Sequence, residues 1–399
     1  MCSKARRESY DFDVIVVGAG PAGSAAARQL AVNGWRVALL EKAGFPGQEN
    51  ACGGMLSLST IVRLELPLEV IEKKMTSENH IMPWGVYKNK TGQCTVQRRV
   101  FDRLLSQRAT EAGAELMSDT VARNVRIVKA GSVEVMIMKR ASSQSTVLRG
   151  RGVIYADGPN TLARSQGLGC KLTHRTTAVA LAYELAWPGN EMDHYRMYYG
   201  TTIGRWGYAW IFPYRDVLNV GIGFILSEVR KRRDLHHALS EFINKHPHAS
   251  PLLSGRQIIW KRGGMIPLRT AQKMAGTSTL IAGDAAGLVH PLVGAGIDNA
   301  LASGELAGNV MSSALAAENL SREFLSKYEY EWKKTPTHRS MQRQHIAAMV
   351  GQALSRVDQN ALAKIIQFFM GGKLTSIGHL KVLAYPLLGM PSQLESIQQ

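Results

Sequence analysis

Three glycines near the amino terminus have the spacing of a phosphate-binding turn. They are Gly18, Gly20 and Gly23, in the pattern G-x-G-x-x-G. They follow the apolar run at residues 12–17, which is typical of a parallel strand buried on both faces. Side chains at these positions would hold a pyrophosphate away from the start of the helix that should follow. Because Glu41 ends the next expected strand, where a carboxylate can accept the ribose hydroxyls, the pattern predicts a dinucleotide site.

A second candidate site is a run of alternating aromatic residues in the middle of the chain, YAWIFP at 208–213. With a period of two, Tyr208, Trp210 and Phe212 project from one face of a strand, and Ala209 and Ile211 project from the other. Such a stripe is often ordinary sheet core. It could also hold an apolar chain by removing it from water, at roughly 0.8 kcal/mol per CH2.

Two later stretches decide which dinucleotide is expected. Residues 155–164 (YADGPNTLAR) and 280–296 (LIAGDAAGLVHPLVGAG) resemble the second and third fingerprints of flavoproteins of the p-hydroxybenzoate hydroxylase-like superfamily. The resemblance implies that the cofactor is FAD, that Asp284 contacts its ribityl chain, and that Asp157 with Gly158 shapes the floor between FAD and a pyridine nucleotide. Arg98 matches an arginine that members use on the FAD side. The other cofactor-binding residues expected are Ala22, Lys42, Gly53, Gly54, Gly294, Gly296 and Ile297.

The aromatic stripe resembles the substrate-wall motif of the geranylgeranyl reductase family, which reads Y-x-W-x-F-P, then seven residues and a glycine. Pro213 and Gly221 complete the motif here. The same family places a C-G-G segment, which begins at Cys52, near the isoalloxazine ring. The resemblance covers residues 12 to about 310. It implies reduction of isoprenoid C=C bonds on a lipid, a diphosphate or a quinone, with a hydride from flavin N5 to one carbon and a proton to the other.

Two residues are candidates for catalysis. Cys52 is expected beside the flavin as a proton donor or a tuning group, and the alternative is a small apolar residue that lets the adjacent glycines approach the ring. His290 follows Asp284 and is expected near the flavin pyrimidine or the substrate mouth, whereas a lone histidine is more often structural. No metal site is expected, because the four cysteines contain no C-x2-C pair.

Composition limits the partners. The chain of 399 residues has 48 Lys and Arg against 31 Asp and Glu, a net charge of +17. An anionic partner such as a dinucleotide phosphate, a phospholipid surface or a lipid diphosphate is therefore expected, with a merely solvated basic face as the alternative. No zinc-finger spacing or nucleic-acid module accompanies the charge, so no nucleic acid is expected. The scattered cysteines fit a reducing cytoplasm, and no stretch reads as a signal peptide or a spanning helix.

The expected fold is a two-lobed α/β flavoprotein. An interrupted Rossmann-like FAD-binding domain should begin with residues 1–90 and be completed by 91–169 and 275–315. A β-rich substrate domain is expected at 170–274, and a helical region at 316–399. Helices are expected at 101–113 and 234–244. The segment 365–391 mixes apolar, aromatic and basic residues, so it could lie on a membrane surface or cap the substrate lobe.

Three other interpretations remain open. The chain could be an electron-transfer-flavoprotein:quinone oxidoreductase of the FixC type, because residues 246–258 and the helical end also resemble that group. It could be a flavin monooxygenase or halogenase, although the halogenase tryptophan motif is not evident. It could also be a redox-sensing or assembly flavoprotein without turnover. The electron donor is open between NADPH and a ferredoxin, because no second G-x-G-x-x-G is present.

Overall fold

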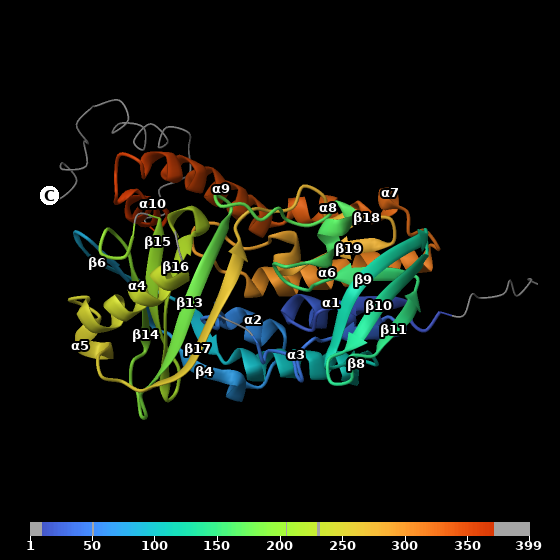
Figure 1. Ribbon diagram of the computed structural model, residues 1–399, viewed down its shortest axis with the longest axis horizontal. Helices are drawn as coiled ribbons and strands as arrows, with labels where there is room; N and C mark the ends of the chain where they lie inside the picture. Colours follow the sequence, from blue (N-terminus) through green and yellow to red (C-terminus); the bar gives the residue numbers. More distant parts are fainter. Residues whose placement is uncertain (1–9, 50–51, 205, 230–231, 371–399) are drawn as a thin grey trace, which may run out of the picture.

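The protein is described by a computed structural model that covers residues 10–49, 52–204, 206–229 and 232–370 (Figure 1). Two large sheets organise the described chain, one with six strands and one with seven. The segment 365–391, for which a membrane surface and a cap on the substrate lobe were both open, is described only as far as Met370, and residues 1–9 lie outside the described residues. Among the described residues, no helix combines the length and the apolar character needed to cross a bilayer.

The six-stranded sheet is the parallel sheet expected around the first glycine turn. Its strands pair in the order β18 (Ala275–Gly276), β19 (Thr279–Ile281), β12 (Gly152–Tyr155), β1 (Val14–Val17), β2 (Val37–Leu40) and β8 (Glu115–Met117). The pairs are parallel except for β18 with β19. Every residue of β1, β2 and β12 is buried, as continuous apolar runs predict for strands covered on both faces.

Helix α1 (Pro21–Val32) follows β1 and packs closely on α6 (Ile297–Ala316). The close approach depends on two glycines of α6. A Cβ on Gly304 would lie 2.1 Å from the carbonyl oxygen of Ala22, and a Cβ on Gly308 would lie 2.8 Å from that of Ala26. Helix α3 (Arg98–Glu111) packs on α1 as well and begins three residues before the expected 101–113.

The seven-stranded sheet contains the aromatic stripe. Its order is β17 (Ile258–Pro267), β13 (Thr177–Ala186), β16 (Val217–Ile225), β15 (Gly207–Pro213), β14 (His194–Tyr198), β5 (Ser77–Met82) and β6 (Gly85–Lys90). All neighbours are antiparallel except β14 and β5. Strands β5 and β6 belong to this sheet although their residues fall in the range 1–90 that was expected to begin the FAD-binding domain.

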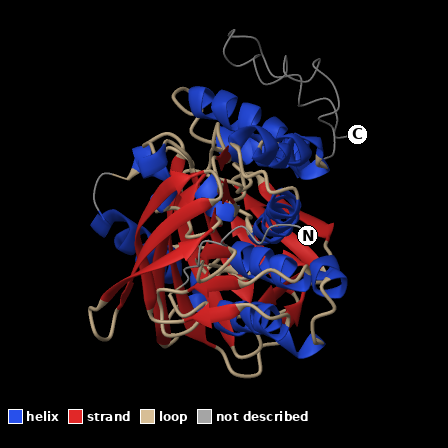
Figure 2. Ribbon diagram, turned by 90° about the vertical axis from the view of Figure 1, so that its right-hand side faces the viewer, coloured by secondary structure: helices blue, strands red, loops and turns tan. Residues whose placement is uncertain are grey.

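Helices cover both faces of this sheet (Figures 1 and 2). On one face, α4 (Arg232–Lys245) and α5 (Ser250–Leu253) contribute apolar side chains to a core with β13, β15 and β16. On the other face, α9 (Pro336–Leu354) and α10 (Ala361–Met370) pack against the aromatic residues. The chain between α6 and α9 forms α7 (Arg322–Leu325) and α8 (Lys327–Lys334).

Two three-stranded sheets complete the described structure. One consists of β3 (Met55–Ser57), β7 (Gln93–Val96) and β4 (Ile71–Lys74), and α2 (Leu58–Arg63) follows β3. The other consists of β11 (Ser145–Gly150), β10 (Ser132–Lys139) and β9 (Thr120–Lys129) and lies at the opposite end of the molecule from β6 (Figure 1). Short 3-10 turns occupy Leu68–Val70, Leu162–Gln166, Leu226–Glu228 and Gly283–Ala286.

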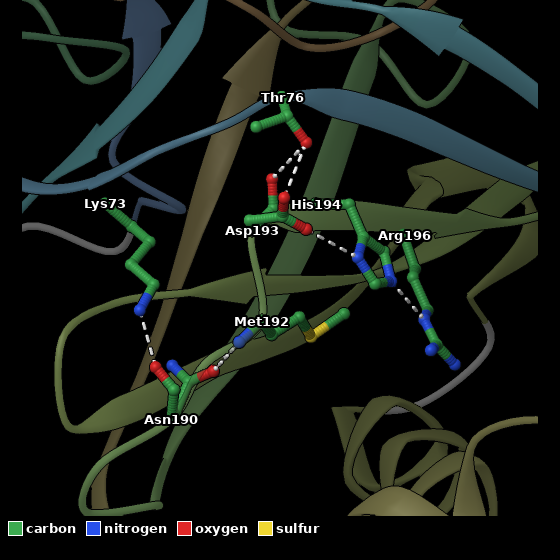
Figure 3. Close-up of polar contacts among 7 residues, drawn as sticks. All are labelled: Lys73, Thr76, Asn190, Met192, Asp193, His194 and Arg196. Atoms are coloured by element: carbon green, nitrogen blue, oxygen red, sulfur yellow. Dashed lines mark hydrogen bonds and ion pairs between the residues drawn. The ribbon is translucent and has the colours of Figure 1, made fainter.

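A polar cluster fixes the parallel register of β5 and β14 (Figure 3). Thr76, the residue before β5, donates its hydroxyl to a carboxylate oxygen of Asp193 at 2.8 Å and its amide to the Asp193 carbonyl at 2.8 Å. Asp193 precedes β14 and also contacts Nδ1 of His194 at 3.3 Å. Lys73 donates to the carbonyl of Asn190 at 2.5 Å. These contacts hold the two strand starts side by side.

Candidate active site

The glycines of the first turn have distinct structural tasks. Gly18 has φ +99°, and a Cβ there would lie 2.4 Å from the carbonyl oxygen of Ala156. A Cβ on Gly23 would meet the Gly18 carbonyl oxygen at 1.8 Å. Both positions therefore require glycine for packing. Gly20 caps the N-terminus of α1, and nothing lies within 4 Å of its Cβ position, so it leaves the helix N-terminus open to an anionic group.

Glu41 lies at the carboxyl end of β2 and is held by backbone amides. Its two carboxylate oxygens accept hydrogen bonds from Ala19 N at 3.2 Å and Ala43 N at 2.9 Å. Burial raises the pKa of Glu41, and these amide hydrogen bonds partly oppose that rise. The neighbouring Lys42 has a largely exposed side chain and forms an ion pair with Glu49 at 3.4 Å. Ala22 is buried and packs on the turn at Gly283.

The second fingerprint lies directly beside the first turn. The Cα of Asp157 is 3.0 Å from the Cβ position of Gly18. One carboxylate oxygen of Asp157 accepts from the amide of Leu162 at 2.7 Å, and the other is buried without a partner among the described residues. Burial raises the pKa of this carboxyl group. Gly158 follows with φ +77° and turns the chain away. A buried oxygen without a partner is a natural place for a ligand donor.

Arg98, Cys52 and Asp284 converge between the two lobes. The Arg98 guanidinium makes two hydrogen bonds of 2.7 Å to the fully buried carboxylate of Asp102, and the Cys52 thiol lies near enough to interact with it electrostatically. Although burial alone would lower the pKa of Arg98, Asp102 and Cys52 raise it. Burial raises the pKa of Asp284, and the charge of Arg98 acts in the opposite direction. The site therefore keeps a permanent cation beside a thiol and a buried acid.

The segment Cys52–Gly54 lies directly against the aromatic stripe. A Cβ on Gly53 would come within 2.6 Å of the Phe212 ring. Gly54 has φ +61°, and a Cβ there would lie 2.1 Å from the Val96 carbonyl oxygen. The Tyr214 hydroxyl donates to the Gly53 carbonyl at 3.2 Å. The two glycines thus let the loop and the aromatic side chains come into direct contact.

The aromatic stripe forms a continuous wall, defined here as Tyr208, Trp210 and Phe212. Consecutive ring centroids are 5.9 and 6.0 Å apart. The intervening Ala209 and Ile211 lie in the core on the opposite face, as the period of two predicts. Gly221 makes room for the central ring, because a Cβ there would lie 2.1 Å from the Trp210 indole. Pro213 ends the strand, and its carbonyl accepts from Thr95 at 2.8 Å.

Asn219 links the wall to the Cys52 loop, and the sequence analysis did not single it out. Its side-chain oxygen accepts from the Trp210 indole N–H at 2.9 Å, and its amide donates to the Cys52 carbonyl at 3.4 Å. It is fully buried. The available signal was its position two residues before Gly221, which places it on the wall face of the next strand.

The turn that contains His290 closes one end of the wall. The Tyr208 hydroxyl donates to the Val293 carbonyl at 2.7 Å. His290 Nδ1 lies 3.1 Å from the Gln344 amide of α9, and burial lowers the pKa of the imidazole. Gly294 has φ +70° in this turn, and Gly296 caps α6 with its Cβ position 3.4 Å from Asp284 Oδ1.

Ile297 begins α6 and does not lie at the turn surface. Its side chain is buried in an apolar cluster with Leu56 and Phe101. The structure therefore gathers most of the predicted residues around the meeting of β1, β12, β15 and the Cys52 loop. Two predicted cofactor-binding residues lie elsewhere. The Lys42 side chain forms an ion pair with Glu49 at the surface, and the Ile297 side chain is buried in the core.

Comparison with known protein families identifies two matching families. Residues 13–201 match the family described as FAD dependent oxidoreductase, and residues 177–266 match the geranylgeranyl reductase catalytic domain. A digeranylgeranylglycerophospholipid reductase of Methanococcus vannielii is 31% identical over 346 residues, which cover 83% of this chain and 84% of that protein. A protein of the same name from Picrophilus torridus is 29% identical over an alignment of 410 residues, which covers 97% of this chain and 98% of that protein.

Solved structures show the same fold. A geranylgeranyl bacteriochlorophyll reductase-like protein from Thermoplasma acidophilum superposes with a TM-score of 0.81 at 26% identity, over 94% of this chain and 96% of that chain. The flavin-dependent halogenase CmlS superposes with a TM-score of 0.73 at 17% identity, over 96% of this chain and 71% of that chain. At that identity the second likeness establishes the fold alone.

Proposed function

The chain belongs to the geranylgeranyl reductase family of FAD-dependent oxidoreductases, and from this premise we propose that it saturates the C=C bonds of geranylgeranyl chains on a glycerophospholipid. The names of its archaeal relatives support this substrate over a free diphosphate or a quinone. The observation that carries the proposal is the contact of the aromatic wall with the Cys52 loop through Phe212 and Gly53. A hydrocarbon chain on this wall would lie within reach of a flavin bound at that loop.

The residues present fit FAD. Gly20 leaves the N-terminus of α1 accessible to a pyrophosphate, Glu41 lies where ribose hydroxyls can be bound, and Asp157 has a buried oxygen without a partner among the described residues. Asp284 and the Gly296 cap of α6 would face the ribityl chain. Bound and reduced, FAD supplies the hydride for the alkene. The protein has to bind the chain flat, exclude water and supply a proton.

Two residues have proposed roles beside the flavin. The Cys52 sulfur accepts a hydrogen bond from the Gly54 amide at 3.4 Å and lies within the electrostatic influence of the Arg98 guanidinium. We propose that this contact positions the loop and tunes the charge next to the ring. His290 is bound to Gln344 of α9, and so we propose that it connects the flavin side of the site with the helix that covers the wall.

The electron donor and the membrane contact belong to the same proposal. A reduced nicotinamide would bind transiently near Asp157, or an acidic ferredoxin would dock on the basic surface that the net charge of +17 provides. We propose that the protein works at the cytoplasmic membrane surface. Ile346 and Met349 of α9 are 52% and 61% exposed, and the exposed Arg339 and Arg343 extend the same helix face.

The test is an anaerobic single-turnover experiment. The FAD-loaded protein is reduced with dithionite and mixed with a digeranylgeranyl glycerophospholipid, while flavin absorbance and lipid mass are followed. We expect reoxidation of the flavin with a gain of two hydrogens per saturated bond. Flavin that stays reduced until a quinone is added, with the lipid unchanged, would instead assign the protein to the electron-transfer-flavoprotein:quinone oxidoreductase type.

A further inference from the structure

A buried chain of polar side chains lies on the same face of the sheet as the aromatic wall. In the parallel pair of β5 and β14, Glu78 lies beside Tyr195 and His80 lies beside Met197. Met197 in turn pairs with Trp210 of β15. The side chains of β5 therefore continue the wall face, and they bring a carboxylate and an imidazole into an otherwise apolar and aromatic cluster.

The chain consists of Glu78, His80 and Tyr199. Nε2 of His80 lies 3.7 Å from a carboxylate oxygen of Glu78, and Nδ1 lies 3.2 Å from the Tyr199 hydroxyl. The His80 and Tyr199 rings are stacked, with centroids 5.8 Å apart and planes 2° from parallel. His80 is 6% and Tyr199 3% exposed. The Tyr199 ring then contacts Tyr208 of the wall at a centroid distance of 6.1 Å.

Glu78 is arranged to stay ionised. Burial would raise its pKa, but the nearby His80 imidazole and the hydrogen bonds from Tyr195 and Asn89 hold the pKa below its ordinary value. Its side chain is 22% exposed, so it also connects the chain to solvent. A carboxylate on one ring nitrogen stabilises the imidazolium and fixes its orientation.

Tyr199 differs from the other tyrosines around the wall. The hydroxyl of Tyr208 donates to the Val293 carbonyl, and that of Tyr214 donates to the Gly53 carbonyl. The hydroxyl of Tyr195 donates to Glu78. A carbonyl or carboxylate oxygen can only accept a hydrogen bond from these phenols and has no proton to give back. The partner of Tyr199 is an imidazole, which can return a proton to a phenolic oxygen. Burial raises the pKa of Tyr199 well above its ordinary value, so the hydroxyl carries its proton at neutral pH.

We propose that Tyr199 donates the proton that completes saturation of the alkene, and that His80 and Glu78 reload it. In the imidazolium form of His80, Nε2 faces Glu78 and Nδ1 donates to Tyr199, so the Tyr199 hydroxyl does not have to donate to His80 and its proton is available to another acceptor. As one alkene carbon receives a hydride, the Tyr199 O–H bond breaks and a C–H bond forms at the other carbon. The Nδ1 proton of His80 then moves to the phenolic oxygen. A proton from solvent reaches His80 by way of the partly exposed Glu78 carboxylate and restores the imidazolium. The reduced flavin supplies both electrons.

This inference rests on the proposed function, so its test starts from the reduced, FAD-loaded protein and the digeranylgeranyl lipid. Tyr199→Phe should lower the single-turnover rate of flavin reoxidation by about 100-fold or more, the range of general acid catalysis, while lipid affinity changes little. The control is Tyr183→Phe. Tyr183 is also buried and bonded to a histidine, His236, at 2.8 Å, but on the opposite face of the same sheet. It should leave the rate unchanged.

A second measurement does not depend on turnover. In the oxidised, lipid-free holoprotein, nitrogen NMR of His80 should show a shifted Nε2 signal in Glu78→Gln and a shifted Nδ1 signal in Tyr199→Phe. Full turnover by Tyr199→Phe, or a His80 signal that neither substitution moves, would overturn the inference alone. A wild-type protein that leaves the lipid unreduced would overturn the proposed function and the inference with it.

Discussion

At the scale of single residues, Asn219 holds the two parts of the site together. One side-chain amide joins the Trp210 indole and the Cys52 carbonyl. Asn219 is fully buried and Trp210 is nearly so, so the indole N–H has its hydrogen-bond partner in Asn219 away from solvent. The same residue therefore contacts both the central ring of the wall and the Cys52 loop.

Replacing this amide tests that coupling. Asn219→Leu removes both hydrogen bonds, and each buried group left without a partner costs about 1–3 kcal/mol. We expect lipid reduction to slow by about 10-fold or more, as misplaced reacting groups do, while FAD stays bound. Steady-state rates and the flavin absorbance of the purified variant measure this. Asn244→Leu, at an exposed position of α4, is the control, and equal rates in both variants would contradict the coupling.

The site residues that could be predicted from the sequence are those marked by a pattern within one short segment. The glycine turn, Glu41 and the wall follow from spacing within one strand or one strand-turn-helix unit. Asn219, His80 and Tyr199 were missed because their roles arise from pairing between β5, β14, β15 and β16. Glu78 and Tyr195, for example, are 117 positions apart in the chain. No periodicity within one segment carries that information.

At the scale of elements, the packing of α1 on α6 determines how the helix that we propose to bind the pyrophosphate is held. The backbones approach so closely at Gly304 that a Cβ would overlap the Ala22 carbonyl. Ala22 lies in the first turn of α1, two residues after the Gly20 cap. A change in α6 therefore acts on the cofactor site without touching its ligands.

Gly304→Ala should destabilise the protein in spite of its helical position. Alanine favours a helix over glycine by about 1 kcal/mol, but a contact of 2.1 Å with backbone forces the two helices apart. We expect a net loss of about 1–3 kcal/mol in the free energy of unfolding, measured by urea denaturation, together with weaker FAD retention. Gly92→Ala, where nothing lies within 4 Å of the Cβ position, is the control. A Gly304→Ala protein as stable as this control would show that the interface adapts.

The secondary structure of individual segments was easier to predict from the sequence than the sheet to which each strand belongs. The apolar run at residues 12–17 predicted β1, the glycine turn predicted that a helix follows, which is α1, and the strand expected to end at Glu41 is β2. The range 1–90 was expected to begin the FAD-binding domain, yet β5 and β6 within it pair with the wall sheet. Parallel pairing of β5 with β14 needs contacts such as Thr76 with Asp193, which join distant segments. Such pairing is set by tertiary structure and not by local pattern.

At the scale of the whole molecule, exposed apolar and basic side chains lie together on α9, the helix that packs over the aromatic wall. Helix α9 packs Ala347 and Ala348 against the wall face and turns Ile346 and Met349 outward. The basic Arg339 and Arg343 flank them. A lipid substrate that entered beneath this helix would come directly from a bilayer to the wall.

This arrangement predicts binding to anionic vesicles through α9. Replacing Ile346 and Met349 together with serine should weaken binding to phosphatidylglycerol vesicles by about 30-fold, because each of the two apolar side chains that enter the interface contributes about 1 kcal/mol. Added salt should weaken wild-type binding further, since the arginines act through charge. Vesicle sedimentation measures both effects. The control is the double serine variant of Ile258 and Ile259, which are 39% and 49% exposed at the edge strand β17. If that control loses binding and the α9 variant keeps it, the membrane-facing surface lies at the sheet edge and the path from bilayer to wall runs along β17.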